Sequence, residues 1–276
     1  MINQKLHLQP LALDTNLHRN LKLKLPLTDW SVAKGLNAMF VAAAEFGDVC
    51  REYPIVFIKA GKEDDGTDAI APVAVFGLNQ DDNLYVNGTE WRAQYVPAVL
   101  RAYPFCIARV DAERFAICID QSHAGFSQTE GVALFEGEAE PTEMLKAMTA
   151  NLENLEGEIQ RTRIIGKRLL ELDLLREMRF DTTMPDGRQH TVDGFLTVDD
   201  KKVTELPEAI VMELHRTGIL GLIHLHWVSI GNMRRLADWY ATRTFGNASA
   251  ALAASSTGTP ATAATAATAT TAPVAV

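Results

Sequence analysis

The chain has 276 residues, 47% of them hydrophobic, and a formal net charge of −9 at pH 7, so it can bury the core of one or two domains. The acidic balance argues against nucleic-acid binding, because the densest basic stretch (161–168) is flanked by acidic residues and is typical of a solvated helix face. The three cysteines, Cys50, Cys106 and Cys118, have no CxxC spacing, which argues against a disulfide framework and a cysteine zinc site.

Targeting signals are not evident in the sequence. The first 14 residues lack an apolar run behind a basic segment, as a secretory signal would have. The most apolar stretch, 219–233, contains two histidines and is shorter than the roughly 20 residues that a bilayer span needs. We therefore expect a soluble, cytoplasmic protein without a membrane span, with export in the absence of a cleaved signal peptide as the alternative.

The first half of the chain is predicted to be rich in β-strands. Alternating apolar residues and lysines at 21–27 predict a half-buried edge strand. The alanine-rich segment 31–54 favours a short helix that ends before Pro54. Apolar runs separated by polar turns rich in Asp, Asn or Gly then predict antiparallel strands: 54–60, 70–78 and 83–91.

Residues 91–105, WRAQYVPAVLRAYPF, combine aromatic, proline and arginine residues at unusual density. Proline lacks an N–H donor and disfavours a helical residue before it. We therefore expect an extended segment to end near Val96 and a single helical turn to cover 98–103, with Pro97 at its start and a second turn of the chain at Pro104.

A hairpin is predicted next, because two apolar runs flank a polar turn in FCIARVDAERFAICID. If Asp111 pairs with Arg114 in the turn, Ile107 lies opposite Cys118. Neighbouring residues of a strand alternate between faces, so in this register Cys106 and Cys118 point to opposite sides of the sheet. They cannot form a disulfide there, and both are expected to be buried free thiols.

Helical periodicity begins at Thr142, a suitable N-cap, and predicts one long helix over 142–175 or two helices joined near Gly157 or Gly166. A polar hairpin turning at 184–188 is expected to lie outside the main core. Two further helices are predicted at the end of the folded region: one within 202–218, which starts near Pro207 and ends near Gly218, and one at 219–243.

These elements predict an α+β protein in which an antiparallel sheet from residues 20–135 packs against C-terminal helices. We expect a β-rich half (1–140) and a helical half (141–246) with a hairpin at about 178–198, together forming one compact domain. Residues 247–276 are almost wholly Ala, Thr, Ser, Pro and Gly and have no amphipathic face, so a disordered tail is predicted.

Metal, cofactor and nucleophile motifs are not recognisable. His224 and His226 are two residues apart and fall on different faces of a helix, whereas a helical zinc pair needs a spacing of four. No glycine-rich nucleotide loop occurs, and Ser122 does not sit in a GxSxG elbow. We therefore expect no metal and no cofactor, with core or interface roles for the histidines.

The strongest candidate for a ligand or partner site is the 91–105 segment. Arginine stacks on aromatic rings and binds carboxylates through two parallel hydrogen bonds. Five residues could form such a surface: Trp91, Arg92, Tyr95, Arg101 and Tyr103. The competing interpretation is a structural corner, in which the prolines and aromatics anchor the chain before the next hairpin.

The sequence resembles the bacterial SapC family, which is named after a surface-layer locus and is distinct from the peptide-transport permease of the same name. The resemblance covers roughly residues 25–242 and rests on WRAQYVPAVLRAYPF, FAICID and LHRTGILGLIHLHWVSIGNMRRLADW. Ala102 stands where the family pattern has a second arginine. The resemblance implies no catalytic residues; it implies an association with uptake or modification of peptides or small molecules.

We therefore expect a non-enzymatic binding or accessory protein whose partner is an unidentified protein, a peptide or a surface-layer component. The apolar helix at 219–242 is a second candidate interface and could form a homo-oligomer. One alternative is an enzyme or enzyme subunit in small-molecule tailoring, with Asp120, His123 and Arg101 as candidate residues. Another is a secreted surface-layer component with residues 247–276 as its export signal or stalk.

Overall fold

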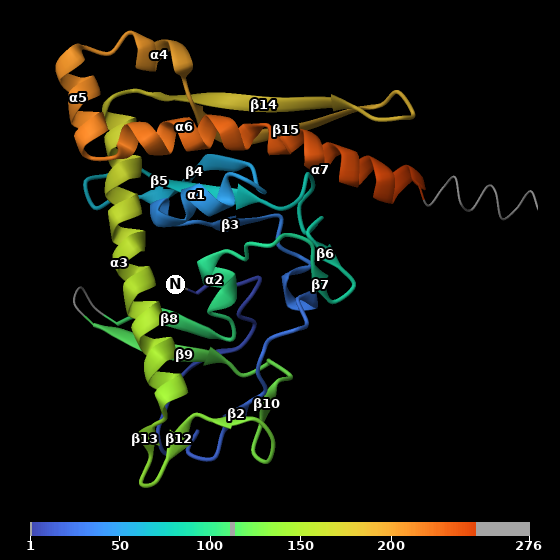
Figure 1. Ribbon diagram of the computed structural model, residues 1–276, viewed down its shortest axis with the longest axis vertical. Helices are drawn as coiled ribbons and strands as arrows, with labels where there is room; N and C mark the ends of the chain where they lie inside the picture. The colour runs from blue at the N-terminus through green and yellow to red at the C-terminus, as the bar shows by residue number, and fades with distance from the viewer. Residues whose placement is uncertain (1, 111–113, 247–276) are drawn as a thin grey trace, which may run out of the picture.

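The computed structural model describes residues 2–110 and 114–246 and confirms the α+β class, with antiparallel sheets in the N-terminal half and most helices in the C-terminal half (Figure 1). The prediction for 247–276 lies outside the described residues. None of the helices in the described ranges combines the length and the apolar composition that crossing a bilayer requires.

A five-stranded antiparallel sheet in the order β14-β15-β4-β5-β3 forms the centre of the fold. Its strands are β3 (Ala38–Phe40), β4 (Ile55–Lys62), β5 (Asp68–Val75), β14 (Leu175–Thr183) and β15 (Gln189–Val198). The apolar runs at 54–60 and 70–78 thus form neighbouring strands, as predicted. The expectation that the later hairpin lies outside the core is wrong, because residues 195–198 are buried and Leu196 pairs with Phe57.

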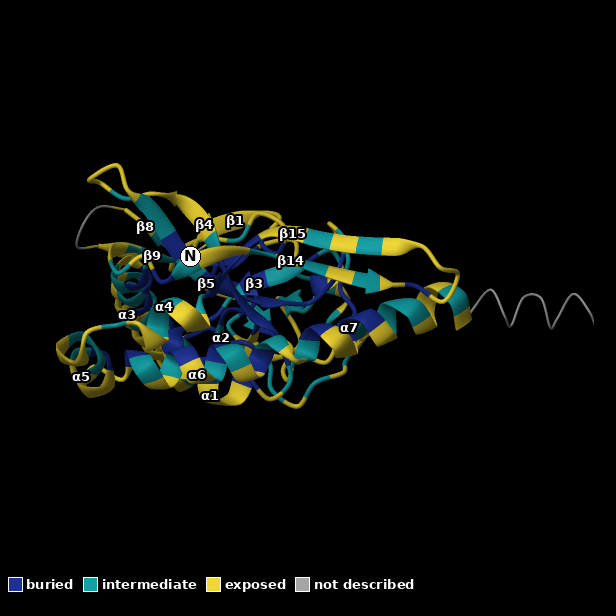
Figure 2. Ribbon diagram, turned by 90° about the horizontal axis from the view of Figure 1, so that it is seen from above, coloured by how far each residue is buried: buried dark blue, intermediate teal, exposed yellow. Residues whose placement is uncertain are grey.

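Figure 2 shows how burial changes along that hairpin: its far end is exposed, whereas the strands at the centre of the sheet are buried. The apolar side chains that decide this are concentrated in the last four residues of β15, and the polar remainder of the hairpin extends into solvent.

A second antiparallel sheet, in the order β1-β9-β8, contains β1 (Pro10–Ala12), β8 (Phe105–Arg109) and β9 (Phe115–Asp120). The predicted hairpin is present, but its register is shifted by one residue: Cys106 lies opposite Cys118. The reason is the loop, since Val110 N donates to Arg114 O at 2.9 Å and closes the hairpin one residue earlier than predicted. The two cysteines therefore share one face, where both are buried free thiols.

Short strand pairs complete the β-structure. β2 (Lys22–Leu23) was predicted to be an edge strand, but it lies between β10 (Phe126–Ser127) and β11 (Val132–Ala133) and is paired on both sides. The segment 83–91 folds back on itself at Gly88, which has a φ of 64°, so it forms two short strands where one was predicted. The remaining strands are β6 (Val86–Asn87), β7 (Glu90–Trp91), β12 (Phe135–Glu136) and β13 (Glu140–Pro141).

Helix α3 (Glu143–Glu171) is one unbroken helix that runs from the lower sheets to the central sheet (Figure 1). It begins at Thr142, whose hydroxyl accepts a hydrogen bond from Leu145 N, as an N-cap does. Gly166 allows α3 to approach the central sheet, because a Cβ at this position would lie 2.3 Å from Ile70 O.

The helix predicted to start near Pro207 and to end near Gly218 is present as α5 (Glu208–Arg216), and the short α4 (Asp200–Thr204) precedes it. The helix predicted at 219–243 is divided into α6 (Ile219–Ile230) and α7 (Asn232–Ala241). Pro207 marks the break before α5, and Gly231 marks the break between α6 and α7. The short turns of the N-terminal half are the 3-10 turns Ser31–Ala33 and Ala43–Glu45, α1 (Phe46–Val49) and α2 (Ala98–Arg101), and Thr242–Gly246 ends the described chain as a π-helical turn.

The histidine on α6 that packs into the core is structural. His226 is fully buried, and its Nε2 and Nδ1 lie 2.8 Å from Thr197 Oγ1 and from Ile55 O, respectively. Burial lowers the pKa of His226 to about 4, so the ring stays neutral and joins α6 to two strands of the central sheet.

Candidate functional site

The 91–105 segment is fixed to the residues before β4 through its backbone. Both carboxylate oxygens of Glu52 accept hydrogen bonds from this segment, one from Gln94 N at 2.9 Å and the other from Tyr95 N at 2.8 Å. The Tyr53 hydroxyl donates to Tyr95 O. The segment is therefore an ordered corner whose side chains have defined directions.

Trp91 belongs to an aromatic cluster beneath this corner. Its Nε1 donates to the Tyr53 hydroxyl at 2.8 Å, and its ring centroid lies 5.2 Å from that of Phe76 and 5.7 Å from that of Tyr85. These contacts account for its half-buried position by packing alone. Arg92 is exposed, and its guanidinium stacks 5.3 Å from the Trp239 ring on α7.

Tyr103 points away from the corner into a buried hydrogen-bonded joint. Its hydroxyl donates to Asp120 Oδ2 at 3.1 Å, and the fully buried Asp120 also accepts from Leu8 N, Gln9 N, Ser122 N and Ser122 Oγ. Burial alone would raise the pKa of Asp120, but the hydrogen bonds from Ser122, Gln9 and Leu8 outweigh it and hold the pKa below its ordinary value. Five donors thus occupy this carboxylate, which ties the N-terminal strand to the end of β9.

A cavity of about 440 Å³ lies beside this joint, and Tyr103, Ser122 and His123 line it. The His123 ring lies 5.1 Å from the Tyr103 ring, and burial lowers its pKa. Ser122 Oγ donates to Asp120 at 2.7 Å, so this hydroxyl is directed at the carboxylate. Arg101 lines a different cavity, and the three residues suggested for an enzyme are therefore divided between two places.

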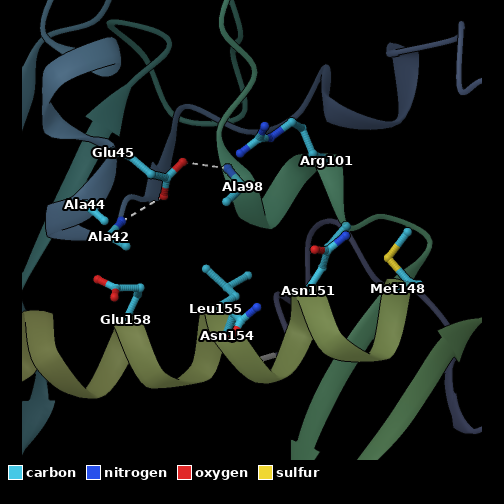
Figure 3. A pocket seen from close by; sticks show the side chains of 11 residues that line it. Ala42, Ala44, Glu45, Ala98, Arg101, Met148, Asn151, Asn154, Leu155 and Glu158 are labelled. Atoms are coloured by element: carbon cyan, nitrogen blue, oxygen red, sulfur yellow. Dashed lines mark hydrogen bonds between the residues drawn. The ribbon is translucent and has the colours of Figure 1, made fainter. Parts of the chain in front are cut away.

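That other cavity has a volume of about 340 Å³ and lies between α2 and α3 (Figure 3). Three groups of residues face it. The 42–45 turn and the α2 turn form one wall with Ala42, Ala44, Glu45, Ala98, Arg101 and Ala102. Helix α3 forms the other wall with residues spaced by three or four along one helix face: Met148, Asn151, Asn154, Leu155 and Glu158.

Glu45 holds the first wall together. One carboxylate oxygen accepts from the Tyr95 hydroxyl at 2.8 Å and from Ala98 N at 2.7 Å, and the other accepts from Ala42 N at 2.9 Å. This buried side chain connects the 42–45 turn, the extended part of the corner and the first residue of α2. Burial and then the charge of Glu45 raise the pKa of Tyr95, so the phenol keeps its proton and donates it to the carboxylate.

Arg101 is placed at the cavity by the same network. Its guanidinium carbon lies 5.2 Å from the Tyr95 ring centroid, and Nη2 lies 3.4 Å from the Tyr95 hydroxyl. Within residues 2–110 and 114–246, Arg101 forms no ion pair. The guanidinium is thus oriented by an aromatic face while its charge remains available to a bound group.

The α3 wall carries polar groups that have no hydrogen-bond partner in the described part of the chain. The side-chain amides of Asn151 and Asn154 form no hydrogen bond with the described part of the chain. Glu158 Oε1 lies 3.3 Å from Arg161 Nη1, but Oε2 is shielded from solvent and accepts no hydrogen bond from the described residues. Three side chains with hydrogen-bonding capacity therefore face the same cavity as Arg101 (Figure 3).

Of the five residues suggested from sequence, Arg101 lines this cavity and Tyr95 stacks on it, whereas the structure places Trp91, Arg92 and Tyr103 elsewhere. Glu45 was not identified because its partners lie about 50 residues away in sequence. The asparagines left no signal either, since the apolar spacing of the predicted helix continues past Asn151 and Asn154 through Leu152 and Leu155.

The comparison with known proteins gives one result. The sequence pattern of the SapC family matches residues 13–236, which include both walls of the cavity. No curated protein and no solved structure matches the chain.

Proposed function

We propose that this chain, which belongs to the SapC family, is a non-enzymatic binding protein that holds a small polar ligand in the cavity between α2 and α3. The observation that carries the proposal is Arg101, a cation stacked on Tyr95 at a cavity of about 340 Å³ and without an ion pair in the described residues. Ligand sites of drug-sized molecules begin at about 300 Å³. A carboxylate or a similar acidic group on the ligand would supply the missing partner.

A role without catalysis is favoured by how the buried carboxylates are used. Glu45 accepts three hydrogen bonds and Asp120 accepts five, so both act as fixed acceptors within the fold. A general base needs a free lone pair within reach of a substrate proton. Such a protein would act as an accessory component that presents a peptide or small molecule to an uptake or modification system.

The proposal is tested by filling the cavity. Ala44 is an exposed residue of the cavity wall, so Ala44→Phe places a ring in the cavity at little expense to the fold. Ala209→Phe makes the same change at an exposed site on α5 and serves as the matched control. Thermal-shift measurements would use a panel of small carboxylates, phosphates and short peptides.

We expect at least one compound to raise the melting temperature of the wild type and of Ala209→Phe, and to leave Ala44→Phe unchanged. Ligand-induced stabilisation follows from mass action, so the shift must grow with the logarithm of compound concentration. A panel without any stabilising compound, or equal shifts in Ala44→Phe and the wild type, would refute the binding role of this cavity.

A further inference from the structure

We infer that the ligand of this cavity is a zwitterion of the short-peptide type, with its carboxylate on Arg101, its ammonium on Glu158 and its amide groups on Asn151 and Asn154. The inference rests on the proposed function of the same cavity and adds the chemical class of the ligand. It rests on four side chains that line one cavity, Arg101, Asn151, Asn154 and Glu158, and on Glu158 Oε2, which is shielded from solvent and has no partner in the described residues.

The positive side of the cavity is suited to a carboxylate. A guanidinium offers two parallel N–H donors that match the two oxygens of a carboxylate, and a stacked guanidinium loses little freedom when it binds. Tyr95 supplies that stacking at 5.2 Å, and Glu45 fixes Tyr95 in turn. Because Glu45 is already occupied by three donors, Arg101 remains open to a ligand from the cavity.

The negative side of the cavity is Glu158, and one of its carboxylate oxygens has no hydrogen-bond donor among the described residues. Glu158 Oε2 is shielded from water, and it accepts no hydrogen bond from the residues that the structure describes. The other oxygen faces Arg161, whose side chain is 70% exposed and thus contributes a weak, screened ion pair. A carboxylate oxygen left in this state is unfavourable, and an ammonium group would supply both a charge and up to three donors.

The length of the α3 wall limits the length of a ligand that lies along it. Asn151 and Glu158 are seven residues apart on α3, which corresponds to about 10 Å of helix rise. An extended peptide advances about 3.3–3.6 Å per residue, so three residues span roughly the same distance. Asparagine side chains offer one acceptor and two donors each, which is the complement of a peptide C=O and N–H.

The remaining walls fit the same class of ligand. Ala42, Ala44 and Ala98 are small and leave room for a peptide backbone, while Met148 and Leu155 provide an apolar surface for small side chains. A dicarboxylate would place a negative group against Glu158, and a diamine would place a positive group against Arg101. Only a ligand with opposite charges at its two ends satisfies both sides of the cavity.

The experiment compares three peptides by isothermal titration calorimetry: trialanine, N-acetyl-trialanine, which lacks the ammonium, and trialanine amide, which lacks the carboxylate. The variants are Arg101→Gln and Glu158→Gln, both at positions that solvent reaches. We expect wild-type protein to bind trialanine at least about tenfold more tightly than either blocked peptide, as the loss of a charge-assisted hydrogen bond implies.

Each variant should lose the difference in affinity between trialanine and one blocked peptide and keep the difference between trialanine and the other. Arg101→Gln is expected to bind trialanine and trialanine amide equally while still rejecting the acetylated peptide, and Glu158→Gln is expected to show the reverse. This crossed pattern assigns each peptide end to its residue, which a general loss of affinity or of folding would not produce.

Equal affinity of the wild type for all three peptides, or no binding of trialanine, would overturn the inference. If another compound of the thermal-shift panel still binds in a manner blocked by Ala44→Phe, the binding role of the cavity stands and only the zwitterionic ligand is refuted. If no compound binds at all, the proposed function itself fails.

Discussion

Replacement of Glu45 by glutamine tests whether one buried carboxylate organises the candidate site. The substitution keeps the size of the side chain but replaces one oxygen by an NH₂ group. Glu45 faces three donors: Ala42 N, Ala98 N and the Tyr95 hydroxyl. In Glu45→Gln one of these donors therefore faces another donor, and the other two bind a neutral amide oxygen in place of a charged one.

The expected loss can be worked out from these contacts. A hydrogen bond to a charged group contributes about 1.5–3 kcal/mol and one between neutral groups about 0.5–1.5 kcal/mol. Losing one charged bond and weakening two others gives a decrease in the free energy of unfolding of about 3.5–6 kcal/mol. For a chain of this size each kcal/mol lowers the melting temperature by roughly 2–4 °C, so we expect a decrease of about 7–24 °C.

Thermal unfolding followed by circular dichroism measures this change, with Glu143→Gln as the matched control. Glu143 undergoes the same chemical change, but its side chain is 88% exposed and forms an ion pair with Lys146 at 2.8 Å. We expect the control to unfold at the wild-type midpoint. A melting temperature of Glu45→Gln within about 2 °C of the wild type would refute the reasoning, because three buried bonds cannot be weakened without cost if they form.

Three further predictions concern other parts of the fold. Gly166→Ala should lower the urea midpoint because its Cβ would meet Ile70 O at 2.3 Å, whereas Gly157→Ala on the same helix meets open space and should raise the unfolding free energy by up to about 1 kcal/mol; equal effects would contradict the close approach of α3. The pKa of Asp120 lies below its ordinary value of 3.8, so the charged carboxylate stabilises the fold at pH values above 3.8. This contribution is lost as the pH falls below 3.8 through the lowered pKa of the folded state. The deficit of Asp120→Asn against the wild type, measured by urea titration, should accordingly be larger at pH 7 than at pH 3, and a constant deficit would argue against the pKa shift. Burial raises the pKa of Cys106 to about 12, so mass spectrometry should detect iodoacetamide modification at pH 8 only after unfolding, and rapid native modification would contradict the burial.

Sequence patterns predicted the elements whose signals are local. The strands at 54–60 and 70–78 follow from continuous apolar runs between polar turns, and the long helix from Thr142 follows from apolar spacing over many turns. In each case the residues that decide the structure are neighbours along the chain. Such signals survive in a single sequence because tertiary contacts reinforce them without changing them.

The register of the β8–β9 hairpin could not be predicted from local sequence patterns. Moving the pairing by one residue exchanges cysteine for isoleucine at several positions, and both are apolar, so the pattern does not choose between the two registers. The hydrogen bond from Val110 N to Arg114 O decides it. The β14–β15 hairpin was misplaced for a related reason: most of it is polar, and its fully buried residues are concentrated in the last four positions of β15.

The candidate site was predicted only in part because its parts are distant in sequence. Arg101 was identified from its chemistry, but the wall opposite it comes from residues about 50 positions later on α3. Glu45 lies in an alanine-rich segment where nothing indicates that its carboxylate will reach Ala98 N. A contact between segments so far apart depends on how the fold brings them together.

The 91–105 segment has two interpretations, a binding surface and a structural corner. They are compatible, because they apply to different residues of the segment. Glu52 and Tyr53 lock the backbone at Tyr95, and Glu45 then holds both the Tyr95 hydroxyl and the first N–H of α2. With Tyr95 and α2 both fixed, the guanidinium of Arg101 has a restricted set of positions. A rigid corner reduces the entropy that a ligand must remove on binding, so the same contacts that make the segment structural also make Arg101 effective as an anchor.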